Sequence, residues 1–563
     1  MIDFNEIKYE RISFNDTREY VNGLIKKLKE CTDFKKYVEI IEKINAWQNH
    51  IEEMNDYADI RNMRDMSNEY WAKEIEYWNG SKAKFDNLFG PFYNELLNSK
   101  FTDKLALVFP PLFFKVIKNQ GELVSNKNIE LIKKENELKM QYRALSKNSF
   151  EFAGELTTIN KISKLCSSND RETRKKAHDA VNDFYYCHSE EYKKILFELI
   201  KVRNEIANNL GLANYVDYSL IKLKRFDYNY DDIQKFRDSI INYIIPVCYK
   251  LKQCQKQELN ISNIMYYDTV FFKDMPKLKF EGQEMLNELY SSFLNADKEL
   301  AEIFKQMFQN NYIDLLSNDN KVNFGITNYL VETKMPVITG NFKKNYLDLQ
   351  TATHEMGHAF QKYCASEKEK ALIVSPLLKY PTMEVAEMFS YGMELIMTDY
   401  VNNLFDKNDY KKYVFMKIYN LIFSLPYTCA VDEFQELIYS KKDLKLEDIN
   451  KIWLDVTKKY QLNTMNKGHI NLESGGYYYR QNHIYLDPFY YIDYALSYFG
   501  ALSLWDSSKD NLEVFKRVGS VASFYSLKEL INKYNISSPF DSNKVKDLSR
   551  TLEKKLDSIK KDI

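Results

Sequence analysis

The sequence predicts a mainly α-helical protein, and two observations carry this prediction. Glycine and proline are scarce, with 16 Gly and 11 Pro in 563 residues, which disfavours a turn-rich all-β protein. Apolar residues also recur at three- and four-residue steps, most clearly in one early stripe formed by Phe34, Tyr37, Val38, Ile41, Ile44, Trp47, Ile51 and Met54. We expect further helices of this kind around residues 127–145, 171–210, 230–260, 283–312 and 410–440.

A short β-ribbon is expected in one region. Residues 323–332 and 335–342 carry β-branched and aromatic side chains and are bounded by Gly and Pro, which indicates two short strands. Two interpretations stay open. The edge of the ribbon could offer unpaired backbone groups to an extended peptide, or the ribbon could be purely structural.

Charge and cysteine content exclude several classes of protein. The 79 Lys and Arg balance 80 Asp and Glu, so nothing favours nucleic acid or an anionic membrane as a partner. The seven cysteines are scattered without CxxC spacing, so neither a disulfide framework nor a cysteine-ligated zinc site is expected. The start of the chain resembles no signal peptide and no stretch approaches bilayer length, so we expect a cytoplasmic protein with no membrane contact.

The most informative stretch follows the predicted ribbon and reads His354-Glu355-Met356-Gly357-His358. Positions i and i+4 share one face of a helix, so His354 and His358 can direct two imidazole nitrogens at one metal ion. Glu355 lies beside them, where a general base for an attacking water belongs. The plainer alternative is a pair of histidines on a solvated helix face.

A third metal ligand is expected from the segment Pro381–Leu395, which holds Glu384, Glu387 and Glu394 among apolar residues. A carboxylate in a buried helix needs a partner such as a metal ion. The spacing alone does not choose between Glu384 and Glu387, and a solvated helix face is the alternative for both.

Several blocks together resemble the thimet-oligopeptidase and oligoendopeptidase F family of zinc peptidases, over roughly residues 150–500. The blocks are the Arg-x-x-Arg helix in 168–177, Arg203–Gly211 followed by Tyr215, the tract HEMGHAFQ at 354–361, Pro381-Thr382, and His483–Leu496. Each block except HEMGH is weak alone, but their order and spacing make the resemblance strong.

The resemblance implies a role for each acidic residue near the histidine pair. The family's metal glutamate lies in a Val-Ala-Glu-x-x-Ser pattern with another glutamate seven residues later, which matches Glu387 and Glu394. Glu387 is then the third ligand. Glu394 would accept a hydrogen bond from the other ring nitrogen of a metal-binding histidine. Glu384 would act in the same way or would be structural.

The resemblance also implies a group that stabilises the oxyanion formed during peptide hydrolysis. His483 matches the family histidine, and Tyr494 matches the family tyrosine. Tyr491 could face the same site, and Tyr490 is its rival because the alignment could slip by one residue. Gly475-Gly476, beside three tyrosines, resembles the family's flexible substrate-facing loop.

The resemblance therefore implies a cytoplasmic zinc endopeptidase with one Zn²⁺ per chain, acting on internal bonds of short peptides. The implied fold is a neurolysin-like helical ellipsoid with a deep substrate channel and a small β-ribbon near the zinc site. Residues 1–150 would form an N-terminal helical region in the channel wall, and residues 151–563 the catalytic region, with no clear linker between them.

Two other functions remain open at this point. A related helical zinc carboxypeptidase or dipeptidyl carboxypeptidase can also carry HEMGH. A non-catalytic peptide-binding protein on the same scaffold is the more remote alternative. The sequence predicts no oligomeric state.

Overall fold

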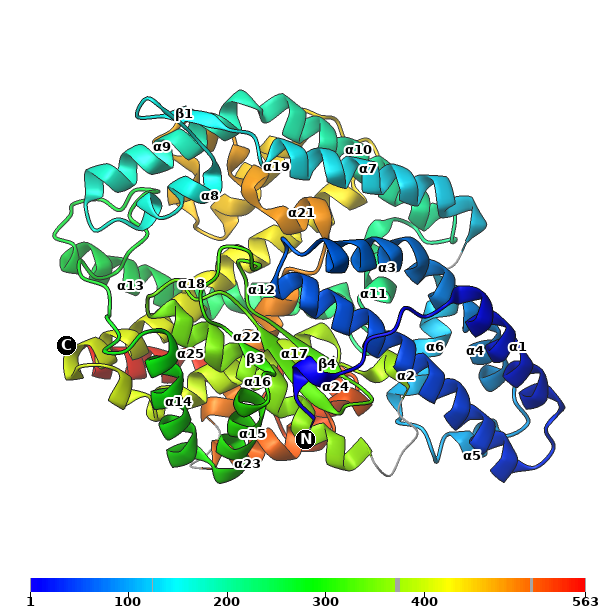
Figure 1. Cartoon of the computed structure of the whole chain (residues 1–563). Coiled ribbons are helices and arrows are strands. Elements are labelled where there is room, and N and C mark those ends of the chain that lie inside the picture. Colours follow the sequence, from blue (N-terminus) through cyan, green and yellow to red (C-terminus); the bar gives the residue numbers. More distant parts are fainter. Residues whose placement is uncertain (1, 124, 370–374, 507–509, 562–563) are drawn as a thin grey trace. The chain divides into compact units, whose positions relative to one another are not determined.

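Helices make up most of the chain in the computed structural model, which describes residues 2–123, 125–369, 375–506 and 510–561 (Figure 1). The expected mainly α class is confirmed. The chain divides into two units, each built from three stretches. Unit 1 comprises Met1–Gly121, Lys277–Tyr410 and Gly500–Ile536, and unit 2 comprises Glu122–Pro276, Lys411–Phe499 and Ser537–Ile563. Each unit thus contains residues from both of the expected regions, 1–150 and 151–563.

Unit 1 holds the predicted ribbon and the HEMGH tract. Its helices are α1 (Phe14–Glu30), α2 (Phe34–Arg64), α3 (Glu69–Leu88), α4 (Gly90–Leu97), α5 (Thr102–Leu105), α6 (Leu112–Glu122), α14 (Gly282–Ala296), α15 (Lys298–Gln309), α16 (Leu347–Glu369), α17 (Met383–Ile396), α23 (Asn511–Gly519) and α24 (Leu527–Tyr534). The early apolar stripe lies on α2. That helix begins where the Asp33 side chain accepts a hydrogen bond from the Lys36 N–H.

A three-stranded sheet in unit 1 has the strand order β3-β5-β4. The central strand β5 (Met335–Thr339) pairs in parallel with β3 (Ile313–Asp314) and antiparallel with β4 (Ile326–Leu330). Every residue of β5 is buried, whereas the first three residues of β4 are half-exposed. The expected ribbon is therefore confirmed as β4 and β5, and β4 is an edge strand. The sequence analysis missed β3, which is only two residues long.

The helix α16 connects the sheet to the rest of unit 1. It packs against β4, β5, α17 and α23, and the labels of α17 and β4 stand close to that of α16 in Figure 1. Most of α17 is buried, including the glutamates that the sequence analysis singled out. A solvated helix face is therefore excluded for Glu384, Glu387 and Glu394.

Unit 2 is also helical. Its elements are α7 (Ile129–Leu145), β1 (Phe150–Phe152), β2 (Glu155–Thr157), α8 (Ile159–Ile162), α9 (Arg171–Cys187), α10 (Ser189–Asn208), α11 (Tyr215–Lys222), α12 (Tyr230–Ser239), α13 (Ile245–Glu258), α18 (Lys407–Ser440, which begins in unit 1), α19 (Asp448–Lys459), α20 (Ile470–Glu473), α21 (Asn482–Leu486), α22 (Ile492–Asp506, which ends in unit 1) and α25 (Ser542–Lys561). One π-helical turn, Ile240–Ile244, joins α12 to α13.

The helix α18 corrects one expectation. It is 34 residues long, and among the described helices it alone is long and apolar enough to cross a membrane by length and composition. The sequence analysis had found no stretch of that length. In the structure 78% of its most apolar window is buried inside the protein, and Pro426 lies within it. A mostly buried core helix meets the same criteria of length and composition.

Candidate active site

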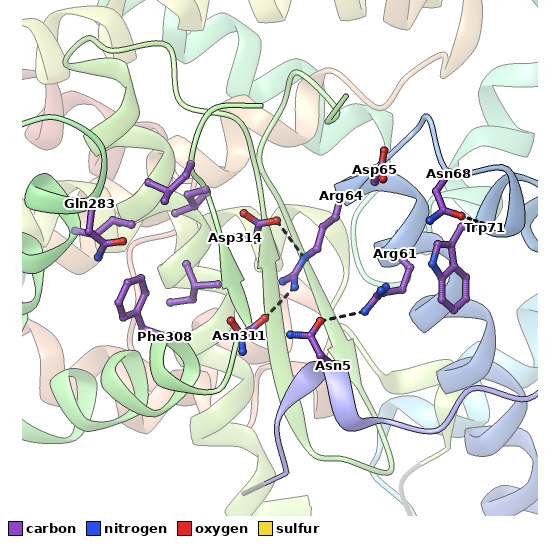
Figure 2. A pocket seen from close by; sticks show the side chains of 14 residues that line it. Asn5, Arg61, Arg64, Asp65, Asn68, Trp71, Gln283, Phe308, Asn311 and Asp314 are labelled. Atoms are coloured by element: carbon purple, nitrogen blue, oxygen red, sulfur yellow. Dashed lines mark hydrogen bonds and ion pairs between the residues drawn. The ribbon is translucent and has the colours of Figure 1, made fainter. Parts of the chain in front are cut away.

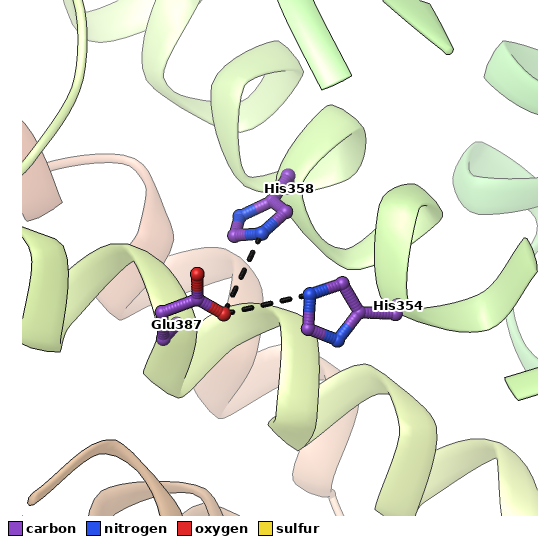
Figure 3. A group of neighbouring side chains, drawn as sticks. All are labelled: His354, His358 and Glu387. Carbon is purple, nitrogen blue, oxygen red and sulfur yellow. Dashed lines mark ion pairs between the residues drawn. The ribbon is translucent and has the colours of Figure 1, made fainter. Parts of the chain in front are cut away.

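Three of the predicted side chains meet where α16 crosses α17. Glu387 Oε2 lies 3.4 Å from His354 Nε2 and 3.8 Å from His358 Nε2, and Figure 3 shows this carboxylate oxygen facing both rings. The three donor atoms all lie within 4.8 Å of one another. The two imidazole rings are nearly perpendicular, with centroids 5.1 Å apart. The structure therefore brings together His354, His358 and Glu387 as a possible metal-binding group.

The distances suit a single small cation. Two donors of a tetrahedral zinc ion, each bonded at about 2.0–2.2 Å, stand about 3.3–3.6 Å apart. The measured 3.4 Å and 3.8 Å separations are close to this range. Glu384 lies one helical turn earlier on α17 and is buried, but it is not a member of the three-donor group. The geometry thus favours Glu387 over Glu384 as the third metal ligand.

The charge states also suit a cation. Burial lowers the pKa of His358 to about 4, so this imidazole is neutral near pH 7 and its Nε2 can offer a lone pair. Burial alone would raise the pKa of Glu387, but the hydrogen bond from His354 and the charges of both imidazoles lower it to about 2. A neutral imidazole and an ionised carboxylate are the forms in which these residues bind metals.

A glycine in the histidine tract permits the close approach of the two helices. A Cβ atom at Gly357 would lie 2.7 Å from Phe389 O, 2.7 Å from Ser390 Cα and 2.9 Å from Met393 Cβ on α17. Real Cβ atoms essentially never come this close, and two of these three atoms belong to the backbone. Only glycine therefore lets α16 and α17 approach until Glu387 reaches the imidazoles. The sequence analysis missed this role of Gly357.

Two hydrogen bonds orient the donors. His354 Nδ1 lies 2.8 Å from Glu394 Oε1, on the side of the ring opposite the nitrogen that faces Glu387. Glu394 thus occupies the place that the family resemblance implied for it. On α17 itself, the Ser390 hydroxyl donates to Glu387 Oε2 over 3.0 Å. Both contacts restrict the rotation of the side chains that form the group.

The side chain of Glu355, on α16, contacts the edge strand β4. It is buried, and its Oε2 accepts a 2.7 Å hydrogen bond from the Thr327 hydroxyl on β4. Burial raises the pKa of Glu355, against the opposing effects of His354 and Thr327. A Cβ at Gly325 would lie 2.8 Å from Glu355 Oε1, so a side chain at this position would clash with that oxygen. Neither Thr327 nor Gly325 was predicted from the sequence as part of the site.

In unit 2, the structure gathers His483 and its three candidate tyrosines into one cluster. The ring centroid of His483 lies 4.7 Å from that of Tyr491, 5.8 Å from that of Tyr490 and 5.9 Å from that of Tyr494. All four side chains are half-buried. Both Tyr490 and Tyr491 lie beside His483, so the structure does not favour one of these rivals over the other.

The comparisons with known proteins identify the family of the chain. Residues 164–524 match the family model described as Peptidase family M3, and residues 4–124 match the model described as Peptidase M3 N-terminal domain. The first match alone covers more than half of the chain. The chain belongs to peptidase family M3.

Relatives and solved structures agree with this membership. An oligoendopeptidase F homolog of Mycoplasma genitalium is 21% identical over 73% of this chain and 69% of the relative. An oligoendopeptidase F homolog of Borreliella burgdorferi is 22% identical over 91% of this chain and 90% of the relative. The structure of Pz peptidase A with an inhibitor is 28% identical with a TM-score of 0.89, covering 99% of both chains. A structure named as an oligoendopeptidase F from Bacillus anthracis is 26% identical with a TM-score of 0.84. The match covers 99% of this chain and 98% of that chain. The resemblance to oligoendopeptidase F is confirmed, and the chain is a peptidase.

The hydrogen bonds around His483 in unit 2 indicate which of its ring nitrogens carries the proton. The Tyr427 hydroxyl donates to Gln481 Oε1 over 2.8 Å, which turns the Gln481 amide nitrogen toward His483 Nδ1, 2.8 Å away. Nδ1 of a neutral His483 then accepts this hydrogen bond, so the ring proton resides on Nε2. Burial lowers the pKa of His483, which favours this neutral form. The sequence analysis did not predict the role of Gln481.

Two buried arginines hold the backbone around His483. Arg203, from one of the resemblance blocks, donates to Tyr485 O over 2.5 Å and forms an ion pair with Glu135 at 2.8 Å. Arg225 donates to Phe489 O over 2.6 Å and forms a 2.7 Å ion pair with Asp493. Phe489 has a φ of +68°, a strained value for a residue with a Cβ. The arginines therefore fix the segment that carries His483 and the tyrosines.

Two other predicted features are structural. Arg171 and Arg174 of the Arg-x-x-Arg block bind the loop around Asp268, through a 2.8 Å ion pair and a 3.1 Å hydrogen bond to Tyr267 O. The segment that begins at Gly475-Gly476 forms a short 3-10 turn in which Tyr478 and Tyr479 are fully buried, and both hydroxyls donate to Asn450 Oδ1. Flexibility of this segment stays a prediction.

A cavity of about 480 Å³ lies in unit 1, and Figure 2 shows the side chains that line it. Charges of both signs line it, from Arg61, Arg64, Asp65 and Asp314. Arg64 donates to the Thr339 hydroxyl on β5 over 3.2 Å and so ties α2 to the sheet. None of the predicted site residues lines this cavity.

Proposed function

We propose that this M3 peptidase is a zinc-dependent endopeptidase that hydrolyses internal peptide bonds of short oligopeptides. The observation that carries the proposal is the group of three donor atoms from His354, His358 and Glu387, all within 4.8 Å of one another. In this proposal they hold one Zn²⁺ per chain. Two imidazole nitrogens and one carboxylate suit zinc better than magnesium or calcium, which prefer oxygen donors.

A bound Zn²⁺ supplies a Lewis acid that polarises the scissile carbonyl and lowers the pKa of the attacking water. Glu355 is the proposed general base, which takes a proton from that water and hands it to the leaving amine. Because the Thr327 hydroxyl donates to Oε2, we assign the proton to Oε1, which lies beside Gly325. The raised pKa of Glu355 supports this role, since a more basic carboxylate takes up a proton more readily.

His483, Tyr494 and Tyr491 or Tyr490 are the proposed donors to the oxyanion of the tetrahedral intermediate. The hydrogen bond from Gln481 supports this role for His483, because it leaves the ring proton on Nε2, where it can be donated. Each such donor commonly contributes a few kcal/mol to stabilisation of the transition state.

The edge strand β4 is the proposed platform for the peptide. An extended substrate can add to an open sheet edge through backbone hydrogen bonds, which do not depend on its sequence. The contact between Thr327 and Glu355 supports this interpretation over a purely structural ribbon, because it places the proposed base beside the half-exposed part of β4. The deep channel implied by the resemblance remains part of this proposal and would restrict substrates to short peptides.

Two variants and one blocked peptide test the proposed function. Glu355→Gln should retain zinc and lose cleavage of an internally quenched peptide blocked at both ends, by a factor on the order of 10³. Glu387→Gln should lose zinc and activity together. An obligate carboxypeptidase would leave the blocked peptide intact. A peptide-binding protein would show no difference between Glu355→Gln and the native chain.

A cytoplasmic location, without nucleic acid or membrane as partner, also stays a proposal. The balanced charge and the seven cysteines, all of them free thiols, support it. Cell fractionation tests it.

A further inference from the structure

The open edge of β4 is capped at one position. The backbone N–H of Tyr329 donates a 2.9 Å hydrogen bond to the hydroxyl of Tyr380, which lies in the segment before α17. In a sheet this N–H would pair with a neighbouring strand, so the Tyr380 hydroxyl occupies a hydrogen-bonding position of the edge. The side chain of Tyr380 is 41% exposed although it makes this contact.

The register shows which other groups of β4 face the same edge. Tyr329 stands opposite Pro336 of β5, and proline has no N–H to donate. The N–H of Tyr329 points away from β5, toward Tyr380. Backbone groups alternate in direction along a strand, so the N–H and C=O of Thr327 point to the same open side. Thr327 is the residue that contacts Glu355.

The two ends of the edge therefore differ. Around Thr327 the strand is half-exposed, and Phe324, just before β4, is 57% exposed. At Tyr329 and Leu330 the strand is buried, and the Tyr380 hydroxyl stands at the edge. Two residues along a strand span about 6.8 Å, so the cap lies one hydrogen-bonding repeat beyond the position next to the proposed base.

The cap is held firmly in place. Lys379 forms an ion pair with Asp56 of α2, and its ammonium group lies 5.2 Å from the centroid of the Tyr380 ring. On the inner side of β4, the ammonium group of Lys362 on α16 lies 4.7 Å from the centroid of the Tyr329 ring. The residue next to Tyr380 is thus tied to α2, and the Tyr329 ring contacts α16.

We propose that Tyr380 is a specificity-determining residue that limits how far a peptide extends along β4 on one side of the scissile bond. A peptide strand pairs with Thr327, and the next pairing position, at Tyr329, is closed by the Tyr380 hydroxyl. On the Gly325 side, no side chain among the described residues is seen to donate to or accept from the edge in this way. This proposal rests on the proposed function, because it takes β4 as the platform for the substrate.

Two nested sets of quenched peptides test the limit. All share one cleavable core, and one set is lengthened residue by residue on the N-terminal side and the other on the C-terminal side. For the native protein, kcat/KM should stop rising, or fall, at a short extension on one side only. In Tyr380→Ala the ratio of kcat/KM for long and short peptides on that side should rise by about twofold to tenfold, the worth of one backbone hydrogen bond.

Two further variants make the result decisive. Tyr380→Phe keeps the ring beside Lys379 and removes only the hydroxyl, so its length ratio should shift in the same direction by a smaller factor. Tyr249→Ala removes a tyrosine that is 61% exposed in unit 2 and should leave the ratio unchanged. Melting curves of all variants report whether they fold.

The proposal is overturned if the native protein, Tyr380→Ala and Tyr380→Phe share one length profile on both sides. It is also overturned if the ratio shifts equally on both sides. If the native protein cleaves none of the peptides, or cleaves them equally after Glu355→Gln, the proposed function itself fails, which is a different result.

Discussion

Gly357→Ala is the most informative single perturbation of the site, because it adds one methyl group and changes no metal donor. The new Cβ would lie 2.7 Å from two atoms of the α17 backbone, whereas ordinary contact begins at 3.4 Å. The two helices must therefore separate locally by about 0.7 Å or distort. Glu387 lies on α17 next to the clash, so its 3.4 Å and 3.8 Å separations from the imidazoles must change.

Two effects follow from this geometry. Overpacking of a helix contact should lower the free energy of unfolding by about 1–3 kcal/mol. Displacement of a metal donor by part of an ångström should lower zinc affinity and reduce kcat/KM by on the order of 10²-fold. Zinc affinity is measured by competition with a chromogenic chelator, kcat/KM with a quenched peptide, and unfolding with urea.

Gly80→Ala is the matched control. Gly80 lies inside α3, where an added Cβ meets no atom within 4 Å, so this variant should stabilise the helix by about 0.5–1 kcal/mol and leave zinc affinity unchanged. If Gly357→Ala binds zinc with native affinity and retains full activity, the close packing of α16 and α17 does not determine the site and the reasoning is refuted.

The remaining predictions concern the contacts around the two sites. Glu394→Gln replaces the carboxylate 2.8 Å from His354 Nδ1 and should weaken zinc binding about 10- to 100-fold, measured by chelator competition; an unchanged affinity would show that this contact is dispensable. Glu135 has its pKa lowered to about 2 because Arg203 and Lys139 outweigh the effect of burial. The folded protein therefore stabilises the ionised form of Glu135. The contribution of Glu135 to the free energy of unfolding is present above about pH 4.5 and is lost as the pH falls toward 2. The difference in unfolding free energy between native and Glu135→Gln should be about 3 kcal/mol at pH 7 and should shrink below pH 4.5; a constant difference would contradict the assignment.

The histidine tract and the helical class could be predicted because each depends on local spacing. His354 and His358 share a face on any helix, and the apolar stripe on α2 follows the same period. The strands β4 and β5 were also visible, because β-branched residues and flanking Gly and Pro mark them locally. The choice of Glu387 over Glu384 needed the family pattern, because one helical turn separates them and both are buried.

The contacts that complete the site depend on tertiary packing and leave no local signal. Gly357 and Gly325 matter because of atoms on α17 and on Glu355, and nothing in their neighbouring sequence reveals those atoms. Gln481 selects the tautomer of His483 only because Tyr427, far away in sequence, fixes its amide. The hydrogen bonds from Tyr478 and Tyr479 to Asn450 could not be predicted for the same reason, because Asn450 lies on another helix.

Digestion of peptides blocked at both ends, followed by mass spectrometry, tests the central proposal most directly. The purified protein should cut these peptides at internal bonds, lose this activity in a chelator, and regain it with stoichiometric Zn²⁺. Glu387→Gln, tested in parallel, should show no recovery with zinc. Internal cleavage that persists in the chelator, or cleavage restricted to peptides with a free C-terminus, would contradict a zinc endopeptidase at His354, His358 and Glu387.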